Sequence, residues 1–67
     1  MKRQLQQYDC FELARDINPA ITKGMTGVIL EIWEPGVFEV EFVKGDATNY
    51  GFNGCYTFTI TVEDISL

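Results

Sequence analysis

The sequence predicts an all-β fold, a small five-stranded barrel, and three observations carry this prediction. Apolar and polar residues alternate in short runs, most clearly in residues 37–43 ("VFEVEFV") and 56–62 ("YTFTITV"), as they do in half-buried strands. Clusters of glycine, proline and asparagine separate the runs and are typical of turns. The chain has 67 residues, 46% of them hydrophobic, which allows one domain with one core. We assign residues 8–67 to the barrel and residues 1–7 to an N-terminal extension.

The first predicted strand covers residues 10–14 ("CFELA"). Its alternation directs Phe11 and Leu13 toward the core. The sequence Asp-Ile-Asn-Pro at residues 16–19 predicts a turn, and the Lys-Gly pair at residues 23–24 predicts a second tight turn. These two turns lead the chain from the first strand into the second.

The second and third strands are predicted to form a hairpin whose turn length decides which residues are buried. Residues paired across an antiparallel ladder project to the same face of the sheet. A three-residue loop at residues 35–37 (Pro-Gly-Val) places Ile32 opposite Val40 and Leu30 opposite Phe42. A two-residue Pro-Gly turn would instead set Ile32 opposite Glu39 and Leu30 opposite Glu41. We therefore predict the three-residue loop.

This register divides the hairpin into two faces. The predicted core face consists of Val28, Leu30, Ile32, Phe38, Val40 and Phe42. The predicted outer face consists of Ile29, Glu31, Trp33, Glu39, Glu41 and Val43. The glutamates then mark the solvent side of a half-buried hairpin, and they discourage pairing of its edges with other chains.

The last third of the chain is predicted to contain a long loop, a strand and a short closing strand. Residues 44–54 ("KGDATNYGFNG") include three of the six glycines and two asparagines, so we expect an exposed loop. The core face of the strand at residues 56–62 consists of Tyr56, Phe58, Ile60 and Val62. A tight helical turn at residues 63–64 precedes the final strand, which closes onto the first.

The charge distribution limits the classes of partner. Ten acidic and five basic residues give a net charge of −5, and the bases are Lys2, Arg3, Arg15, Lys23 and Lys44. Such a surface repels phosphate backbones, so we expect no nucleic-acid partner. No apolar run has the length of a membrane span or follows the pattern of a signal peptide. We therefore expect a cytoplasmic protein that does not bind membranes.

The sequence offers no pattern typical of a catalytic or metal site. Histidine, the commonest general base and metal ligand, does not occur in the sequence. Cys10 and Cys55 lack zinc-site spacing, and we expect two free, partly buried thiols. Asp46, Asn49 and Asn53 lack the spacing of a calcium loop and are interpreted as turn residues. We expect neither an enzyme nor a cofactor nor a bound metal.

Several of these motifs resemble an uncharacterised bacterial family, domain of unknown function 4926. The resemblance lies in "FELARDI", in "KGMTGVILEIW" with "FEVEFV", and in the threonine-rich strand with "EDI", over about residues 8–66. Its most specific features are the pair Gly24 and Gly27 and the Glu-Val-Glu-Phe motif at residues 39–42. The loop "GDATNYGFNGCY" departs from the shorter, more acidic connection usual in that family. The resemblance implies an SH3-like five-stranded small barrel and supplies no reaction.

A second stretch, "VEFVKGDATNYGFNG", is similar to SH3-type docking subunits such as the photosystem I accessory subunit. The Asn-Tyr-Gly sequence at residues 49–51 carries most of this similarity. Both resemblances imply the same barrel, and a shared fold does not by itself determine function.

The candidate partner-binding residues are aromatic and acidic. They are Trp33, Glu31, Glu39 and Glu41 on the outer face of the hairpin, and Tyr50 and Phe52 in the glycine-flanked loop. Exposed aromatic residues rimmed by polar groups are typical of protein interfaces. An alternative stays open, in which Trp33 folds over the end of the barrel and Phe52 plugs its mouth.

The sequence favours a non-enzymatic protein-protein interaction module, a monomer or small homo-oligomer, whose acidic, aromatic-bearing surface recognises a basic partner protein. The alternative is an acidic inhibitor or immunity-type protein that blocks the cationic nucleic-acid-binding groove of an enzyme, because a compact and strongly acidic scaffold suits that task. Binding by groove mimicry depends on many charges and responds strongly to salt, whereas binding through an aromatic anchor does not.

Overall fold

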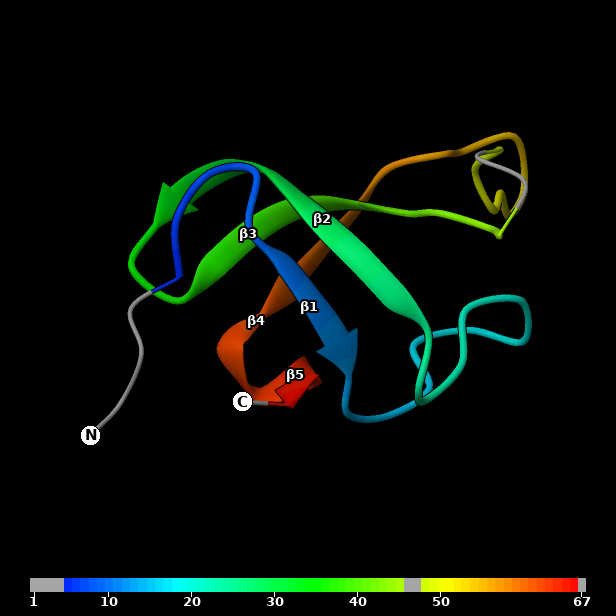
Figure 1. The fold of residues 1–67 in the computed structure, drawn as a ribbon, viewed down its shortest axis with the longest axis horizontal. Coiled ribbons are helices and arrows are strands. Elements are labelled where there is room, and N and C mark those ends of the chain that lie inside the picture. The colour runs from blue at the N-terminus through cyan, green and yellow to red at the C-terminus, as the bar shows by residue number, and fades with distance from the viewer. Residues whose placement is uncertain (1–4, 46–47, 67) are drawn as a thin grey trace.

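The computed structural model describes residues 5–45 and 48–66, which form one five-stranded antiparallel sheet (Figure 1). The elements are β1 (Cys10–Leu13), β2 (Thr26–Glu34), β3 (Val37–Phe42), β4 (Phe58–Thr61), the 3-10 helix η1 (Val62–Asp64) and β5 (Ile65–Ser66). The strand order is β4-β3-β2-β1-β5. The sheet curves into a half-barrel consistent with a small SH3-like barrel, so the predicted fold class is confirmed. In the described part of the chain, no helix is long and apolar enough to cross a membrane.

The hairpin between β2 and β3 turns in two residues. Glu34 pairs with Val37, which leaves Pro35 and Gly36 as the turn. Gly36 has a φ of 84°, the conformation that glycine adopts after proline in a type II turn. The predicted three-residue loop is therefore wrong.

Two one-residue register shifts in β2 decide which face each residue occupies. Ile29 pairs with Val40, but Glu31 pairs with Glu39, so one residue of β2 between them has no counterpart on β3. A second shift follows between Ile32 and Glu34. The extra residues are Leu30 and Trp33, and each forms a β-bulge that changes the phase of the strand.

Because of the bulges, the buried residues of β2 differ from the predicted ones. Ile29, assigned to the outer face, is fully buried. Val28 and Leu30, assigned to the core, are only half-buried, and Ile32 is 40% exposed. A strict period of two could not predict this arrangement, because one inserted residue moves all later side chains to the opposite face.

The core is a single cluster of apolar side chains. Its buried members are Leu5, Phe11, Leu13, Ile21, Ile29, Phe38, Val40, Phe42, Ile60 and Ile65. The ring of Phe42 lies 5.7 Å from the Phe11 ring, edge to face, and 5.9 Å from the Phe58 ring. Gly27, which pairs with Phe42, makes room for this packing, because a Cβ there would lie 2.5 Å from Cζ of Phe11.

Several of these core residues were predicted and others were not. The burial of Phe11, Leu13, Phe38, Val40, Phe42 and Ile60 is confirmed. Tyr56 and Val62 were predicted to be core but are 58% and 44% exposed, because β4 is shorter than the alternating run and neither residue belongs to it. Leu5, which lies in the predicted N-terminal extension, packs in the core.

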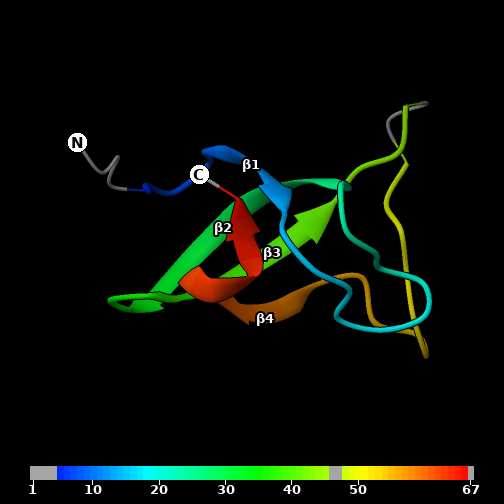
Figure 2. The ribbon, with the colours of Figure 1, turned by 90° about the horizontal axis from the view of Figure 1, so that it is seen from below.

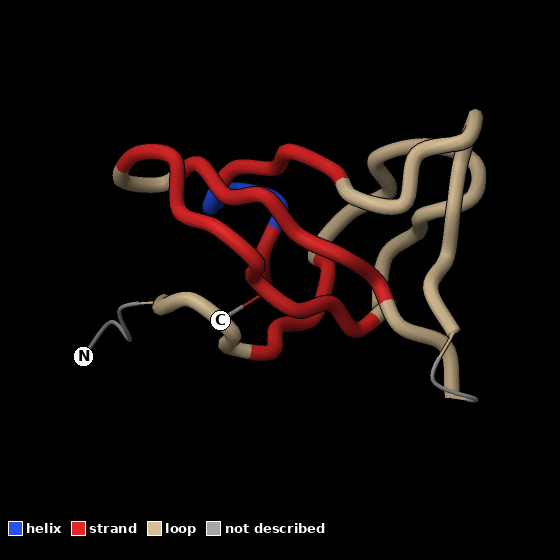
Figure 3. Tube along the Cα trace, turned by 90° about the horizontal axis from the view of Figure 1, so that it is seen from above, coloured by secondary structure: helices blue, strands red, loops and turns tan. Residues whose placement is uncertain are grey.

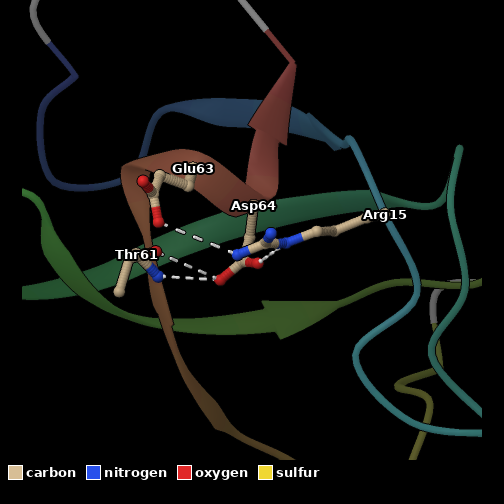
Figure 4. Close-up of polar contacts among 4 residues, drawn as sticks. All are labelled: Arg15, Thr61, Glu63 and Asp64. Atoms are coloured by element: carbon tan, nitrogen blue, oxygen red, sulfur yellow. Dashed lines mark hydrogen bonds and ion pairs between the residues drawn. The ribbon is translucent and has the colours of Figure 1, made fainter.

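Asp64 holds the closing end of the barrel (Figure 4). Its Oδ2 accepts a hydrogen bond from the backbone N–H of Thr61 at 3.0 Å, as part of a capping box at the start of η1. Its Oδ1 accepts one from Nε of Arg15 at 2.6 Å. Its backbone carbonyl accepts the N–H of Ala14 at 2.7 Å, and the next residue, Ile65, pairs with Leu13 on β1. The predicted closure of the last strand onto the first is confirmed.

Asp64 is nearly buried, yet its environment favours the charged form. Burial alone would raise the pKa of Asp64, but the backbone N–H of Thr61 and the guanidinium of Arg15 stabilise the carboxylate more strongly. The pKa of Asp64 is therefore below its ordinary value of 3.8. Ionised Asp64, at the end of η1, can therefore accept hydrogen bonds from Thr61 at the end of β4 and from Arg15 in the β1–β2 loop at the same time.

The observed register makes Ile29, and not its neighbour Leu30, the residue whose truncation unfolds the domain. Ile29→Ala should lower the free energy of unfolding by about 2–5 kcal/mol and Ile29→Val by about 0.5–1.5 kcal/mol, because a fully buried side chain leaves a cavity. Leu30→Ala should cost clearly less than Ile29→Ala. Urea unfolding followed by circular dichroism measures all three. Equal losses for the two alanine variants would contradict the bulge at Leu30.

Asp64→Ala should lower the free energy of unfolding by about 1–3 kcal/mol, because it leaves the Thr61 N–H and the Arg15 guanidinium without their acceptor. Glu63→Ala is the matched control, since Glu63 is exposed and lies 3.9 Å from the same guanidinium, and it should stay close to wild type.

The contribution of Asp64 should also depend on pH. A carboxylate whose pKa is lowered in the folded state stabilises the fold above its unfolded value, and this stabilisation disappears as pH falls through the folded pKa. The difference in stability between wild type and Asp64→Ala should therefore shrink as pH falls below 3.8. A difference that stays constant in thermal unfolding between pH 7 and pH 2 would show that the charge of Asp64 is irrelevant.

Candidate functional site

The predicted partner-binding residues fall into two groups at different ends of β3. Glu31, Trp33 and Glu39 lie toward the β2–β3 turn, and we call them the hairpin patch. Tyr50 and Phe52 belong to the long loop between β3 and β4, which extends from the opposite end of the hairpin (Figures 1 and 3). Glu41 lies nearer the loop, where its Oε1 accepts a hydrogen bond from Nδ2 of Asn49 at 2.9 Å.

Trp33 is the most exposed member of the hairpin patch. Its side chain occupies a bulge position and is 61% exposed, and bulges commonly redirect a side chain away from the sheet. The indole Nε1 donates a hydrogen bond to Oε1 of Glu39 at 3.3 Å. The predicted exposure of Trp33 is confirmed, although the register from which it was predicted is wrong. The alternative in which Trp33 folds over the barrel end does not agree with this exposure.

Glu39 is held in place by side-chain donors from three positions. The hydrogen bond from the Thr57 side chain has the largest effect on the pKa of Glu39. Oγ1 of Thr59 donates to Oε1 of Glu39 at 2.9 Å. With the indole of Trp33, these hydroxyls lower the pKa of Glu39 below its ordinary value of 4.5, against a smaller opposing effect of burial. Glu39 is therefore ionised and oriented at neutral pH.

Glu31 lies directly opposite Glu39 on the β2–β3 ladder. Like charges at directly opposed positions destabilise a sheet. Nε2 of Gln7 donates to Oε1 of Glu31 at 3.3 Å and to the carbonyl of Leu30 at 2.9 Å. Among the described residues, no lysine or arginine forms an ion pair with Glu31 or Glu39. The hairpin patch thus presents two opposed carboxylates and an exposed indole.

Tyr50 and Phe52 are both half-buried. Tyr50 packs against the core, and Nζ of Lys44 lies 5.1 Å from the centre of its ring, a cation–π distance. Phe52 pairs with Cys55 around a tight Asn-Gly turn, in which Asn53 and Gly54 have φ values of 52° and 79°. The loop aromatics are less available to a partner than Trp33 is.

Sequence reasoning missed two features of this region. The Asn-Gly dipeptide at residues 53–54 is a strong signal for a two-residue hairpin turn of type I′, and the loop does fold into one. The hydroxyls of Thr57 and Thr59, which alternate with the predicted core residues of the run 56–62, orient Glu39. Their position on the face opposite the core could have indicated contact with the neighbouring glutamates.

The two cysteines are free, as predicted, but both are exposed and not partly buried. Cys10 lies on the outer side of β1, where it pairs with Val28, and Cys55 lies in the turn of the long loop. In the described part of the chain, no group of three or more cysteine, aspartate or glutamate side chains is arranged to hold a metal ion.

Comparison of the chain with protein-family models, with curated proteins and with solved structures finds no match. The resemblances to domain of unknown function 4926 and to the photosystem I accessory subunit therefore stay predictions. Function has to be inferred from the geometry of the hairpin patch.

Removing the threonine hydroxyls should raise the pKa of Glu39. Carboxyl-detected NMR titration of wild type should place this pKa below 4.5, and Thr57→Val with Thr59→Val should move it upward, because fewer donors then stabilise the charge. Since the folded pKa is lowered, the associated stability is present above 4.5 and is lost as pH falls through the folded pKa. Thr26→Val, on β2 away from Glu39, is the control. An unchanged pKa in the double variant would contradict the assigned contacts.

Proposed function

We propose that this chain is a non-enzymatic protein-protein interaction module of the bacterial cytoplasm that binds a basic partner protein through the hairpin patch. The observation that carries the proposal is the pair of opposed carboxylates beside an exposed indole, with no cation paired to them among the described residues. No nucleic acid, membrane or cofactor takes part. The chain's net charge of −5 supports a partner of opposite sign.

A lysine or arginine side chain of the partner fits the hairpin patch chemically. Placed between Glu31 and Glu39, its charge removes the repulsion between the two carboxylates and forms charge-assisted hydrogen bonds. The indole of Trp33, which already contacts Glu39, offers an adjacent face for a cation–π contact and for apolar packing of the side-chain stem. Arginine matches this combination best, since its planar guanidinium both binds carboxylates in two places and stacks on aromatic rings.

The hydrogen bonds to Glu39 serve the proposed binding by preorganisation. A carboxylate already held by Thr57, Thr59 and Trp33 loses little conformational freedom when a partner binds. Glu41 extends the proposed surface along β3 toward the long loop, and a partner that reaches the opposite end of the hairpin would also meet Tyr50 and Phe52.

Trp33→Ala should weaken binding of an arginine-containing peptide at least tenfold, because an exposed aromatic anchor dominates a small interface. The fold should stay intact, with a change of stability within about 0.5 kcal/mol. Binding can be followed by NMR shifts of the Trp33 indole and the Glu39 carboxyl on addition of the peptide. Tyr56→Ala is the matched control, because Tyr56 is a similarly exposed aromatic residue outside the hairpin patch.

Two results would contradict the proposal. The first is a Trp33→Ala variant that binds like wild type. The second is binding that weakens steeply with added salt, as many ionic contacts would make it do, and that is unchanged by Trp33→Ala. That result would favour the alternative function, an inhibitor of a cationic groove. Capture of partners from a bacterial lysate with wild-type and Trp33→Ala bait, followed by mass spectrometry, would then identify the natural partner.

A further inference from the structure

The strand β4 forms one edge of the sheet and has unpaired backbone groups on its free side. β3 is its only neighbour in the strand order, and β4 runs along the rim of the sheet (Figure 2). The N–H of Val62 donates to the carbonyl of Gly36 at 2.9 Å. Hydrogen-bonded pairs alternate along an antiparallel ladder, so Ile60 and Phe58 direct their backbone groups to β3. Thr59 and Thr61 therefore direct theirs to the free side.

The outward groups of Thr61 are engaged at the start of η1. The N–H of Thr61 donates to Oδ2 of Asp64 at 3.0 Å, which ends the free ladder at Thr61. The N–H and carbonyl of Thr59 have no partner among the described residues. Thr59 thus lies at the centre of an open edge.

This edge lacks most of the features that normally prevent strand addition. Proteins protect exposed edges with short strands, charged residues, proline, bulges or a covering segment, and of these β4 has only its short length of four residues. Residues 57–61 ("TFTIT") contain no charge, proline or glycine, although the chain as a whole carries a net charge of −5. Between Phe58 and Thr61 the pairing with β3 is regular.

The sequence around Thr59 is nearly symmetric, and this symmetry indicates the partner. Threonines stand two residues before and after Thr59, and apolar residues stand at the intervening positions. The exposed apolar side chains Tyr56 and Val62 stand three residues before and after it. A second copy running antiparallel about a two-fold axis at Thr59 therefore meets matching residues at every position.

We propose that β4 pairs with β4 of a second copy of this chain, antiparallel and centred on Thr59. Each Thr59 N–H then donates to the carbonyl of the other Thr59. On the core side, Phe58 lies opposite Ile60 of the second copy, an aromatic–β-branched pair of the kind that stabilises sheets. At both ends, Tyr56 of one copy comes close to Val62 of the other, so exposed apolar surface is covered.

Charge repulsion does not oppose this pairing. The carboxylate at the free edge is that of Asp64, which is paired with Arg15, and the outer-face carboxylates of Glu39 lie on β3, one strand in from the edge. With strands about 4.8 Å apart, the two Glu39 rows of a dimer are separated by roughly 14 Å. This exceeds the screening length of about 8 Å at physiological salt. The interface is small, so the dimer is expected to be weak and dependent on concentration.

The test is sedimentation equilibrium of the full chain from about 1 μM to about 1 mM. The expected mass rises from 7.6 kDa toward twice that value. Thr59→Pro removes the outward N–H without touching the β3 ladder, which proline tolerates at an edge, and should weaken dimerisation at least tenfold. Thr59→Val is the matched control, because it loses only the hydroxyl bond to Glu39 and should still dimerise.

Amide hydrogen exchange of the unmodified chain tests the β4–β4 pairing even if Thr59→Pro fails to fold. Exchange at Thr59 should slow as the protein concentration rises, whereas the Thr61 amide, bonded to Asp64, should exchange slowly at every concentration. A mass that stays at 7.6 kDa, a dimer that survives Thr59→Pro, or a dimer abolished by Trp33→Ala instead would each overturn the proposal. Protection of Thr59 only on addition of a foreign peptide strand would overturn it as well.

Discussion

The two bulges in β2 are the constraint on which the rest of the structure depends. Ile29 and Ile32 are three residues apart, and a regular strand would direct them to opposite faces. The extra residue at Leu30 lets both lie on the side of their β3 partners Val40 and Phe38. The same insertion sets Glu31 opposite Glu39, and the second bulge directs Trp33 into solvent. Bulges also increase local twist, which helps a sheet of short strands to curve around so small a core.

Curvature alone does not close the barrel, because β5 has only two residues. The closure depends on Asp64, which joins the end of β4, the start of η1 and Arg15 after β1. A buried carboxylate is stabilising only when its acceptor capacity is filled, and here the two side-chain oxygens accept from three donor groups of Arg15 and Thr61. Asp64 therefore substitutes for the long strand pairing that a 67-residue chain cannot supply.

The sequence predicted best where the chain obeys a regular period. Phe38, Val40 and Phe42 belong to an unbroken strand, and alternation identified all three. Alternation failed in β2, since the position of a bulge depends on the partner strand and on core packing, which no local pattern records. It also failed at Tyr56 and Val62, where the alternating run extends past both ends of the strand.

The candidate site, like the fold, could be predicted from the sequence only in part. Trp33 and the glutamates stood out by residue type, and the predicted exposure of Trp33 is correct although the register behind it is wrong, because the second bulge directs Trp33 into solvent. The separation of Trp33 from Tyr50 and Phe52 could not be predicted, because it depends on the direction in which the long loop leaves β3 (Figure 1). The role of Thr59 was hidden as well, since a threonine on an outer face has no distinctive sequence signal until its neighbours across the sheet are known.

The hairpin patch and the β4 edge are joined through Thr59. Its hydroxyl donates to Glu39, while its backbone N–H and carbonyl face the free side of the sheet. A strand that pairs with this backbone restricts the motion of Thr59, and a donor with less freedom orients its acceptor at a lower entropic cost. Glu39 in turn orients the indole of Trp33. A strand bound at the edge would therefore act, through two hydrogen bonds, on the groups proposed to receive a basic side chain, and this would couple the two proposed surfaces.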